Sequence, residues 1–167
     1  MNYHVTIRPV KLGDEKTLAY IQTESWKTAF SHILSKDDLD KYTNLAKAEE
    51  MYTMLLTQNY RKGFILFLDD NPHCIAYWDK SRDETMAEYA ELICIHSLAT
   101  HWGKGYGSKM MDFLLTQMRE EGFKQVLLWV FEDNHRARKF YENHGFVLSD
   151  KTKKFCDAIE VMYVKEL

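Results

Sequence analysis

Two short stretches of the chain combine residue types whose spacing suits a phosphorylated ligand. The first reads Trp102-Gly-Lys-Gly-Tyr-Gly107, and the apolar spacing of a helix follows over Ser108–Glu120. Glycine lets the main chain approach an anion closely, and the N–H groups at a helix N-terminus attract phosphate. The second stretch runs from Asn134 to Tyr141, seven residues later and therefore on the same face of a helix. Together they predict a turn that binds a diphosphate beside a helix that carries a tyrosine.

Two better-known phosphate-binding loops do not fit this spacing. A loop for nucleoside triphosphates has Lys-Ser or Lys-Thr directly after its last glycine, whereas Gly107 is followed by Ser108-Lys109. A dinucleotide fold has Gly-x-Gly-x-x-Gly near the start of the chain, whereas these glycines are Gly103, Gly105 and Gly107. A tight turn without a ligand is disfavoured, because alternating glycines cost ordering entropy without a packing benefit.

The pattern of apolar residues predicts the elements that position these stretches. One helix begins after Asp14 as its N-cap, and the others are predicted over Ala46–Leu56, Ser108–Glu120 and Asn134–His144. The turn formers at 69–72 join two strands as a hairpin. The predicted strands are Val5–Arg8, Phe64–Leu68, His73–Trp78, Tyr89–Leu98, Gln125–Phe131 and Glu160–Val164. Because no repeat or linker interrupts this order, we expect one mixed α/β sheet in a single domain over residues 1–167.

Composition excludes several classes of protein. The formal net charge is −3, so the chain lacks the basic stripe that nucleic-acid binding needs and mildly favours a cationic substrate. No apolar run is long enough to cross a bilayer, and no secretory signal is apparent, so we expect a cytoplasmic protein that does not enter a membrane. Three widely spaced cysteines, Cys74, Cys94 and Cys156, indicate buried thiols rather than disulfides or a metal site.

The two motifs, in this order, resemble the GNAT superfamily of N-acetyltransferases. Its coenzyme A loop has the pattern Gln/Arg-x-x-Gly-x-Gly/Ala after the fourth strand, and Trp102–Gly107 looks like that loop. Asn134–Phe146 is similar to the helix after the fifth strand, and Trp26–Phe30 to the first-helix region of small-molecule members. The resemblance implies acetyl-CoA as cofactor and the acyl-CoA N-acyltransferase fold, with a mixed, mostly antiparallel central sheet flanked by helices. Trp102 departs from the pattern, because it stands where Gln or Arg is usual.

The resemblance also implies how acetyl-CoA is bound. Main-chain amides of the turn hold the two phosphates, and the pantetheine arm pairs with the fourth strand around Ile95 and Ser97. Asn134 donates to that arm, although Asn is equally suited to cap the helix. Lys109 and Lys139 are further cations near the turn. The predicted cofactor-binding residues are Ile95, His96, Ser97, Trp102, Gly103, Lys104, Gly105, Tyr106, Gly107, Ser108, Asn134, Arg138 and Tyr141.

Acetyl transfer to an amine needs a base for the ammonium proton and an acid for the departing thiolate. Tyr141 is the predicted acid, with a core aromatic as the alternative. Glu91 on the fourth strand is the predicted base, and Glu88, His96 or a water remain alternatives. Strand parity separates Glu91 from His96 unless the strand contains a bulge, as the resembling fold does. Direct transfer requires no covalent intermediate, so Cys94 is not needed as a nucleophile.

We therefore expect an N-acetyltransferase that acts on a primary amine of a small molecule, with a polyamine as one candidate. A protein or peptide N-acetyltransferase and a non-catalytic coenzyme A-binding module remain alternatives. Exposed strand edges can pair with a second copy of the chain, so a homodimer remains an alternative. Aromatic side chains suit an apolar or cationic acceptor and aspartates suit a polyamine, although core packing and a solvated loop explain them equally. The residues considered for this site are Trp26, Phe30, Tyr77, Trp78, Asp37, Asp38 and Asp40.

Overall fold

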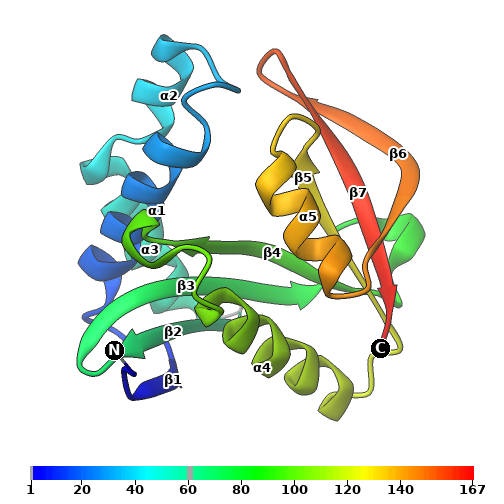
Figure 1. Cartoon of the computed structure of the whole chain (residues 1–167), viewed down its shortest axis with the longest axis horizontal. Coiled ribbons are helices and arrows are strands. Elements are labelled where there is room, and N and C mark those ends of the chain that lie inside the picture. Colours follow the sequence, from blue (N-terminus) through cyan, green and yellow to red (C-terminus); the bar gives the residue numbers. More distant parts are fainter. Residues whose placement is uncertain (1, 60–61) are drawn as a thin grey trace.

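One sheet of seven strands, in the order β1-β2-β3-β4-β5-β7-β6, connects the two halves of the chain (Figure 1). The computed structural model describes residues 2–59 and 62–167. Neighbouring strands are antiparallel except β4 and β5, so the mixed, mostly antiparallel sheet is confirmed. The strands are β1 (Val5–Pro9), β2 (Lys62–Leu68), β3 (Asn71–Lys80), β4 (Ala90–Ser97), β5 (Gln125–Phe131), β6 (Val147–Phe155) and β7 (Ala158–Glu166).

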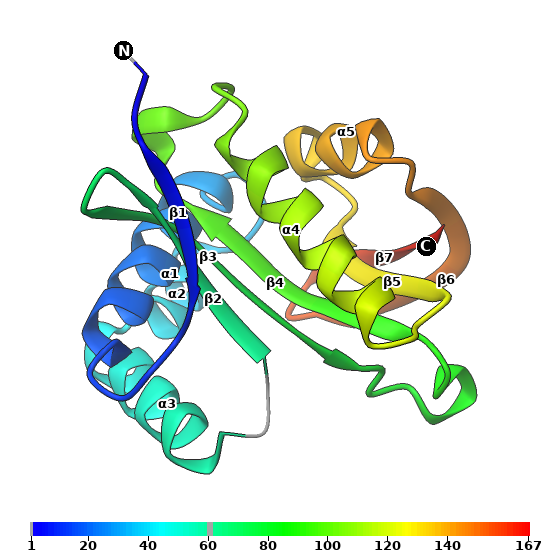
Figure 2. The same ribbon diagram turned by 90° about the horizontal axis from the view of Figure 1, so that it is seen from below.

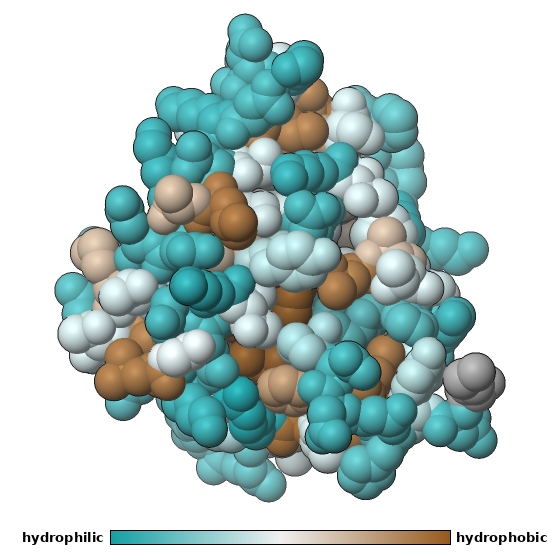
Figure 3. All heavy atoms as spheres, turned by 90° about the vertical axis from the view of Figure 1, so that its left-hand side faces the viewer, coloured by the Kyte–Doolittle hydropathy of each residue, from teal (hydrophilic) through white to brown (hydrophobic). Residues whose placement is uncertain are grey.

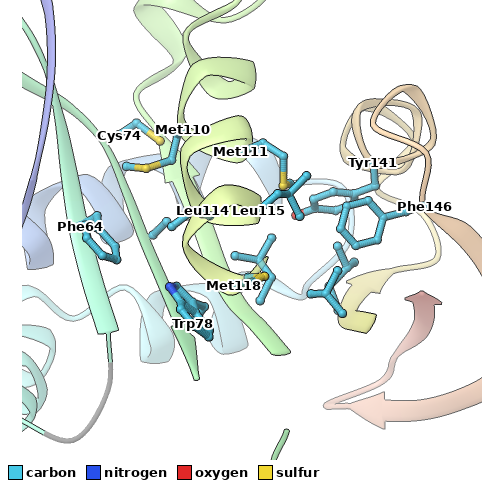
Figure 4. Packing of buried hydrophobic residues seen from close by; sticks show 14 of the residues in the cluster. Phe64, Cys74, Trp78, Met110, Met111, Leu114, Leu115, Met118, Tyr141 and Phe146 are labelled. Atoms are coloured by element: carbon cyan, nitrogen blue, oxygen red, sulfur yellow. The ribbon is translucent and has the colours of Figure 1, made fainter. Parts of the chain in front are cut away.

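Helices cover both faces of this sheet (Figure 2). On one face, Leu18 and Ile21 of the first helix pack with Tyr52 and with Ile75 of β3. On the other face, a stripe from Met110 to Met118 fills the space between β3 and the last helix (Figure 4). The helices are α1 (Glu15–Ala29), α2 (Lys36–Tyr42), α3 (Leu45–Gln58), α4 (Tyr106–Glu120) and α5 (His135–Asn143), with short 3-10 turns at Glu84–Met86 and Ala99–His101.

The two central strands, β4 and β5, pair over a short length only. Their parallel register covers Ala90↔Val126 to Leu92↔Leu128, and the strands then diverge (Figure 1). Within the described residues, 93–97 of β4 therefore have no strand partner on that side. Main-chain N–H and C=O groups must find a partner when they leave water, so this edge is suited to an extended ligand.

A bulge in β4 changes which of its side chains share a face. The register shift between Tyr77 and Trp78 of β3 leaves Ile93 as an extra residue on β4. An extra residue reverses the alternation of the side chains that follow it. Glu91 and His96 consequently lie on the same face of the sheet, which strand parity alone would not allow.

Two elements of the structure are absent from the prediction, and both are weakly buried. The helix α2 has no buried residue, and the Oγ of Ser35 caps it by accepting from the N–H of Asp38. The strand β6 lies at the edge of the sheet and none of its residues is buried, so it lacks the apolar alternation that reveals a strand.

The surface over α1, α2 and α3 is mostly hydrophilic, with separate apolar side chains among the polar ones (Figure 3). Leu45, Met51 and Met54 of α3 and Tyr20 of α1 are exposed large hydrophobic residues. Among the described residues, no helix has both the length and the apolar character that a membrane crossing requires.

Candidate active site

A cavity of about 610 Å³ lies where β4 and β5 diverge. This volume falls within the range of small-molecule sites, which is roughly 300–1,000 Å³. Most of the residues that line it fall into two groups. The turn group consists of Ser97, Trp102, Gly103, Gly105, Tyr106, Gly107, Ser108, Asn134, Arg136 and Tyr141. The aromatic group consists of Trp26, Phe30, Arg82, Trp129, Phe131, Lys153, Phe155 and Glu160.

Most of the residues predicted from the sequence line this one cavity. Besides the members of the turn group, Ile95 and His96 of β4 also line it. The structure places Lys104, Arg138 and Glu91 outside the lining. The residues that the sequence analysis missed are Arg82, Trp129, Phe131, Arg136, Lys153, Phe155 and Glu160.

The glycine turn needs its glycines for backbone conformation rather than for space. Gly103 and Gly105 have φ values of +76° and +84°, in the left-handed region, and nothing lies within 4 Å of a Cβ added at either position. Gly105 is also the N-cap of α4, a helix of 15 residues. The unpaired N–H groups of the first helical turn therefore meet the cavity through Tyr106, Gly107 and Ser108, which line it. Such an arrangement of N–H groups is suited to binding an anion.

Trp102 ties the turn to the end of β4. Its indole N–H donates to the carbonyl oxygen of Ser97 at 3.0 Å and to the Oγ of Ser97 at 3.1 Å. The guanidinium of Arg136 lies 3.5 Å from the centre of the Trp102 ring. Burial lowers the pKa of Arg136 below its ordinary value. An arginine from α5 thus reaches the turn, although the turn itself lacks the Gln or Arg of the family pattern.

Arg138, which was predicted to meet a phosphate, has other partners. Its Nε donates to the hydroxyl of Tyr163 at 2.9 Å, and its Nη1 donates to the carbonyl oxygen of Glu132 at 2.9 Å. Residues two apart on a helix point in different directions, so Arg136 and Arg138 have different surroundings. The sequence signal for Arg136 was its place in the first turn of α5, directly after the Asn134 cap.

Asn134 and Tyr141 both present polar groups to the cavity. The Oδ1 of Asn134 caps α5 by accepting from the N–H of Ala137 at 3.2 Å, which leaves the side-chain amide N–H groups without a partner in the described residues. The ring of Tyr141 packs beside Phe146, and the residue is only 8% exposed (Figure 4). Its hydroxyl makes no hydrogen bond within the described part of the chain. Burial raises the pKa of Tyr141, so the phenol keeps its proton.

Glu91 is engaged by a neighbour rather than by the cavity. Its side chain is buried, and Arg82 donates to it from the main-chain N at 3.0 Å and from Nε at 3.0 Å, with Nη2 also in contact. These hydrogen bonds hold the carboxylate toward Arg82 rather than toward the cavity, which Glu91 does not line. Glu88, the other carboxylate considered, is exposed and does not line the cavity.

His96 lines the cavity, but its acceptor nitrogen is occupied. The indole N–H of Trp26 donates to the Nε2 of His96 at 3.3 Å. An indole only donates, so this contact assigns the proton of the neutral ring to Nδ1. Burial lowers the pKa of His96 to about 4. His96 is therefore neutral and makes a poor base.

The rings of the aromatic group contact one another across three elements, α1, β5 and β6. Trp26 and Phe30 of α1 have ring centroids 4.9 Å apart, Phe30 lies 4.9 Å from Phe131 of β5, and Phe131 lies 5.8 Å from Phe155 of β6. Tyr77 and Trp78, which were considered for this site, line no part of it and are buried in the core instead. The aspartates 37, 38 and 40 of α2 also lie outside the lining.

Glu160 is the only carboxylate among the described residues that line the cavity. The sheet register places it beside Phe131 of β5 and Lys153 of β6. The Nζ of Lys153 lies 3.8 Å from Oε2 of Glu160 and 4.2 Å from the centre of the Trp129 ring. Burial raises the pKa of Glu160, against the opposing effect of Lys153 and Arg82. A carboxylate of this kind is a better proton acceptor than an exposed one.

Residues 19–146 match the model of the Acetyltransferase (GNAT) family. The match spans more than half of the chain, so this chain belongs to the GNAT family of acetyltransferases. The predicted family is thereby confirmed, and with it acetyl-CoA as the cofactor of an N-acetyltransferase.

Individual relatives agree with this assignment. The chain is 25% identical over 139 residues to the uncharacterized N-acetyltransferase YuaI of Bacillus subtilis, covering 78% of this chain and 73% of the relative. It is 22% identical over 151 residues to a spermidine N(1)-acetyltransferase of Thermoplasma acidophilum, covering 87% and 90%. The crystal structure of the PaiA N-acetyltransferase of Thermoplasma acidophilum with coenzyme A has the same fold, with a TM-score of 0.80 at 18% identity, covering 95% of this chain and 98% of that chain.

Proposed function

We propose that this protein transfers the acetyl group of acetyl-CoA directly to a primary amine of a small molecule held in the aromatic group. The observation that supports this most is the hydroxyl of Tyr141, which has no partner in the described residues and lines the same cavity as the glycine turn. The proton donor and the N–H groups of the turn would then contact the same ligand, acetyl-CoA. The spermidine N(1)-acetyltransferase relative also supports an amine as acceptor.

The turn group fits acetyl-CoA. The N–H groups from Gly103 to Ser108 bind the diphosphate, with the charge of Arg136 beside them. The free edge of β4 at Ile95 and Ser97 pairs with the amides of the pantetheine arm, and the unpaired amide of Asn134 donates to the same arm. When bound there, the cofactor supplies the thioester.

The protein's own side chains then supply proton transfer. Tyr141 holds a proton at its hydroxyl and donates it to the departing sulfur. Glu160 accepts the proton of the acceptor ammonium, because it is the only carboxylate among the described residues that line the cavity and burial raises its pKa. Glu160 takes the place of Glu91 in this role, and Glu91 instead fixes the position of Arg82. Cys94 has no role as a nucleophile.

Calorimetric titration with acetyl-CoA and a thiol-release assay test this proposal. We expect binding heat, and thiol release with at least one member of a panel of polyamines, amino acids and aminoglycosides. Heat without thiol release would indicate a non-catalytic coenzyme A-binding module, and release with N-terminal peptides alone would indicate a protein acetyltransferase. Absence of heat would contradict the cofactor site.

The variant Gly105→Val tests whether the glycine turn binds acetyl-CoA. A branched side chain at φ +84° is strained by about 1–2 kcal/mol, so we expect roughly tenfold weaker binding of acetyl-CoA. Circular dichroism should be unchanged, because the added side chain meets no neighbour at its Cβ.

A further inference from the structure

The charged members of the aromatic group indicate the chemical class of the acceptor. We propose that the acceptor amine also carries a carboxylate, as an amino acid does, and that Lys153 and Arg82 bind this carboxylate while Glu160 faces the amine. This inference rests on the proposed function and narrows it. A polyamine, which has amines but no anion, is then a poor acceptor.

The balance of charge in the cavity argues for an acceptor with an anion. Within the aromatic group the lining holds two cations, Arg82 and Lys153, against one carboxylate, Glu160, and a third cation, Arg136, lines the cavity at the turn. Glu91 lies behind Arg82 and neutralises it, so the cluster has no surplus of negative charge. A polyamine would add at least two positive charges to a cluster in which two cations are already balanced by two carboxylates, and nothing there would offset the added charge. An amine with a carboxylate adds one charge of each sign.

Both cations retain groups that are free to bind an anion. Arg82 uses Nε and Nη2 on Glu91, and its Nη1 has no partner among the described residues. The Nζ of Lys153 pairs with Oε2 of Glu160 at the long distance of 3.8 Å, and an ammonium group has three N–H donors, so some of them remain for a second anion. The two side chains come from different elements, the loop before β4 and strand β6, so they present two separate donors to one carboxylate.

The neighbouring residues of the described lining offer the acceptor apolar contacts but no second carboxylate that a second amine could bind. Phe30, Phe131 and Phe155 line the same cavity as the charged side chains and contact one another. The aspartates that would attract a polyamine lie on α2 outside the lining, and Asp40 there already pairs with Lys36 at 2.7 Å. An amino acid with an apolar side chain fits this combination.

Matched pairs of acceptors that differ only by a carboxylate test the proposal. The pairs are phenylalanine with phenethylamine, and lysine with 1,5-diaminopentane, compared by kcat/KM for thiol release. We expect about tenfold or greater preference for the carboxylated member of each pair, because a hydrogen bond to a charged group is lost in the other. Higher kcat/KM for the decarboxylated members or for spermidine would overturn the proposal.

Variants of Lys153 test whether this residue causes the preference for carboxylated acceptors. Lys153→Gln should remove most of the preference by raising KM for the carboxylated acceptor about tenfold, with KM for acetyl-CoA unchanged. Lys153→Arg should restore it. Lys154→Gln is the matched control, because Lys154 is the next residue of β6, is exposed and does not line the cavity. An equal loss in Lys154→Gln, or no loss in Lys153→Gln, would contradict the assignment.

Calorimetric binding of each acceptor pair to the complex with coenzyme A separates this inference from the proposed function. Coenzyme A carries no acetyl group, so no turnover occurs. Tighter binding of the carboxylated members supports the inference even if thiol release is never observed, which would refute the proposed function alone. Equal or tighter binding of the decarboxylated members refutes the inference even if the enzyme is active.

Discussion

The turn group and the aromatic group of the cavity are built from different parts of the chain. The turn group comes almost entirely from two short segments, residues 97–108 and 134–141, and much of its binding capacity is in main-chain N–H groups. The aromatic group takes side chains from α1, the loop before β4, and the strands β5, β6 and β7. One group depends on local backbone conformation, the other on how distant strands are aligned.

This difference matches the different tasks that we propose for the two groups. A site made of main-chain groups changes only when the backbone changes, so it is suited to a cofactor that every member of the family binds. A site made of side chains at register positions changes by substitution without disturbing the sheet. We infer that acceptor choice in this chain is set by residues such as Lys153 and Glu160, and cofactor choice by the turn.

The largest expected effect is on Tyr141, the member of the turn group that we propose as the proton donor. Tyr141→Phe should lower kcat by about 100-fold or more, because general acid catalysis commonly contributes a factor of roughly 10²–10⁴. The affinity for acetyl-CoA should change little, because the hydroxyl has no partner in the described residues and the ring keeps its packing. Steady-state thiol release and calorimetry measure the two quantities.

Tyr163→Phe is the control for Tyr141→Phe. The hydroxyl of Tyr163 donates to Glu142 at 2.6 Å and accepts from Arg138, outside the cavity. Its loss should lower the free energy of unfolding by about 1 kcal/mol and leave kcat unchanged. An unchanged kcat in Tyr141→Phe would remove the acid from the mechanism.

The next effect concerns the aromatic group alone. Burial raises the pKa of Glu160, so a base at this position loses activity as the pH falls through a value above the ordinary carboxyl range. Glu160→Gln should lower kcat/KM by about tenfold or more and abolish this acidic limb of the pH profile. Binding of acetyl-CoA should be unaffected.

The variant Glu91→Gln tests which of two carboxylates, Glu91 or Glu160, acts as the base. It weakens the pairing with Arg82, yet the acidic limb should persist if Glu160 is the base. Loss of the limb in Glu91→Gln, with the limb intact in Glu160→Gln, would return the role of base to Glu91.

The sequence predicted much of the fold, because most elements have one clearly apolar face. The stripe of α4 and the dense apolar run of β5 are examples. The edge strand β6 and the short helix α2 were missed, since neither buries enough side chain to show a pattern. The bulge at Ile93 is a property of the pairing between β3 and β4, and no local signal in β4 reveals it.

The site was predictable to the extent that it is local. The glycine turn and the helix with Asn134 and Tyr141 are motifs within a few residues, and all three line the cavity. Glu160, Lys153 and Phe131 become neighbours only through the register of three strands, one of which was not predicted. Trp26 and Phe30 of the aromatic group were already considered from the sequence and line the cavity. Sequence spacing carries no information on the juxtaposition of distant strands, so the charged members of this group had to come from the structure.

Arg136 provides a smaller test of the turn group. Arg136→Ala should raise KM for acetyl-CoA about three- to tenfold, because the change removes a cation at the turn and its contact with the Trp102 ring. The acceptor KM should not change. Arg138→Ala is the control, and it should leave both KM values unaltered because Arg138 is bound to Tyr163 and Glu132. The reverse ranking of the two variants would place Arg138 at the cofactor after all.

The smallest effect on activity is expected from a change outside both groups. Asp14 stands at the N-cap position of α1 as predicted, but its side chain makes no cap bond. It accepts instead from Arg8 at 2.8 and 2.9 Å and from the N–H of Lys11 at 2.9 Å. These hydrogen bonds, with Arg8 the main cause, hold the pKa of Asp14 below its ordinary value.

Asp14→Asn should therefore lower the free energy of unfolding by about 1 kcal/mol at pH 7, a value reduced for the partial exposure of Arg8. A lowered pKa contributes stability above the pKa of the unfolded chain, about 3.9, and that contribution is lost as the pH falls through the lower folded value. The difference between wild type and variant in urea unfolding should narrow below pH 4, while kcat and acetyl-CoA affinity stay unchanged. If this difference in the free energy of unfolding persisted at low pH, the ion pair between Arg8 and Asp14 would not be its source. A fall in kcat would show that the two groups of the cavity depend on the start of α1.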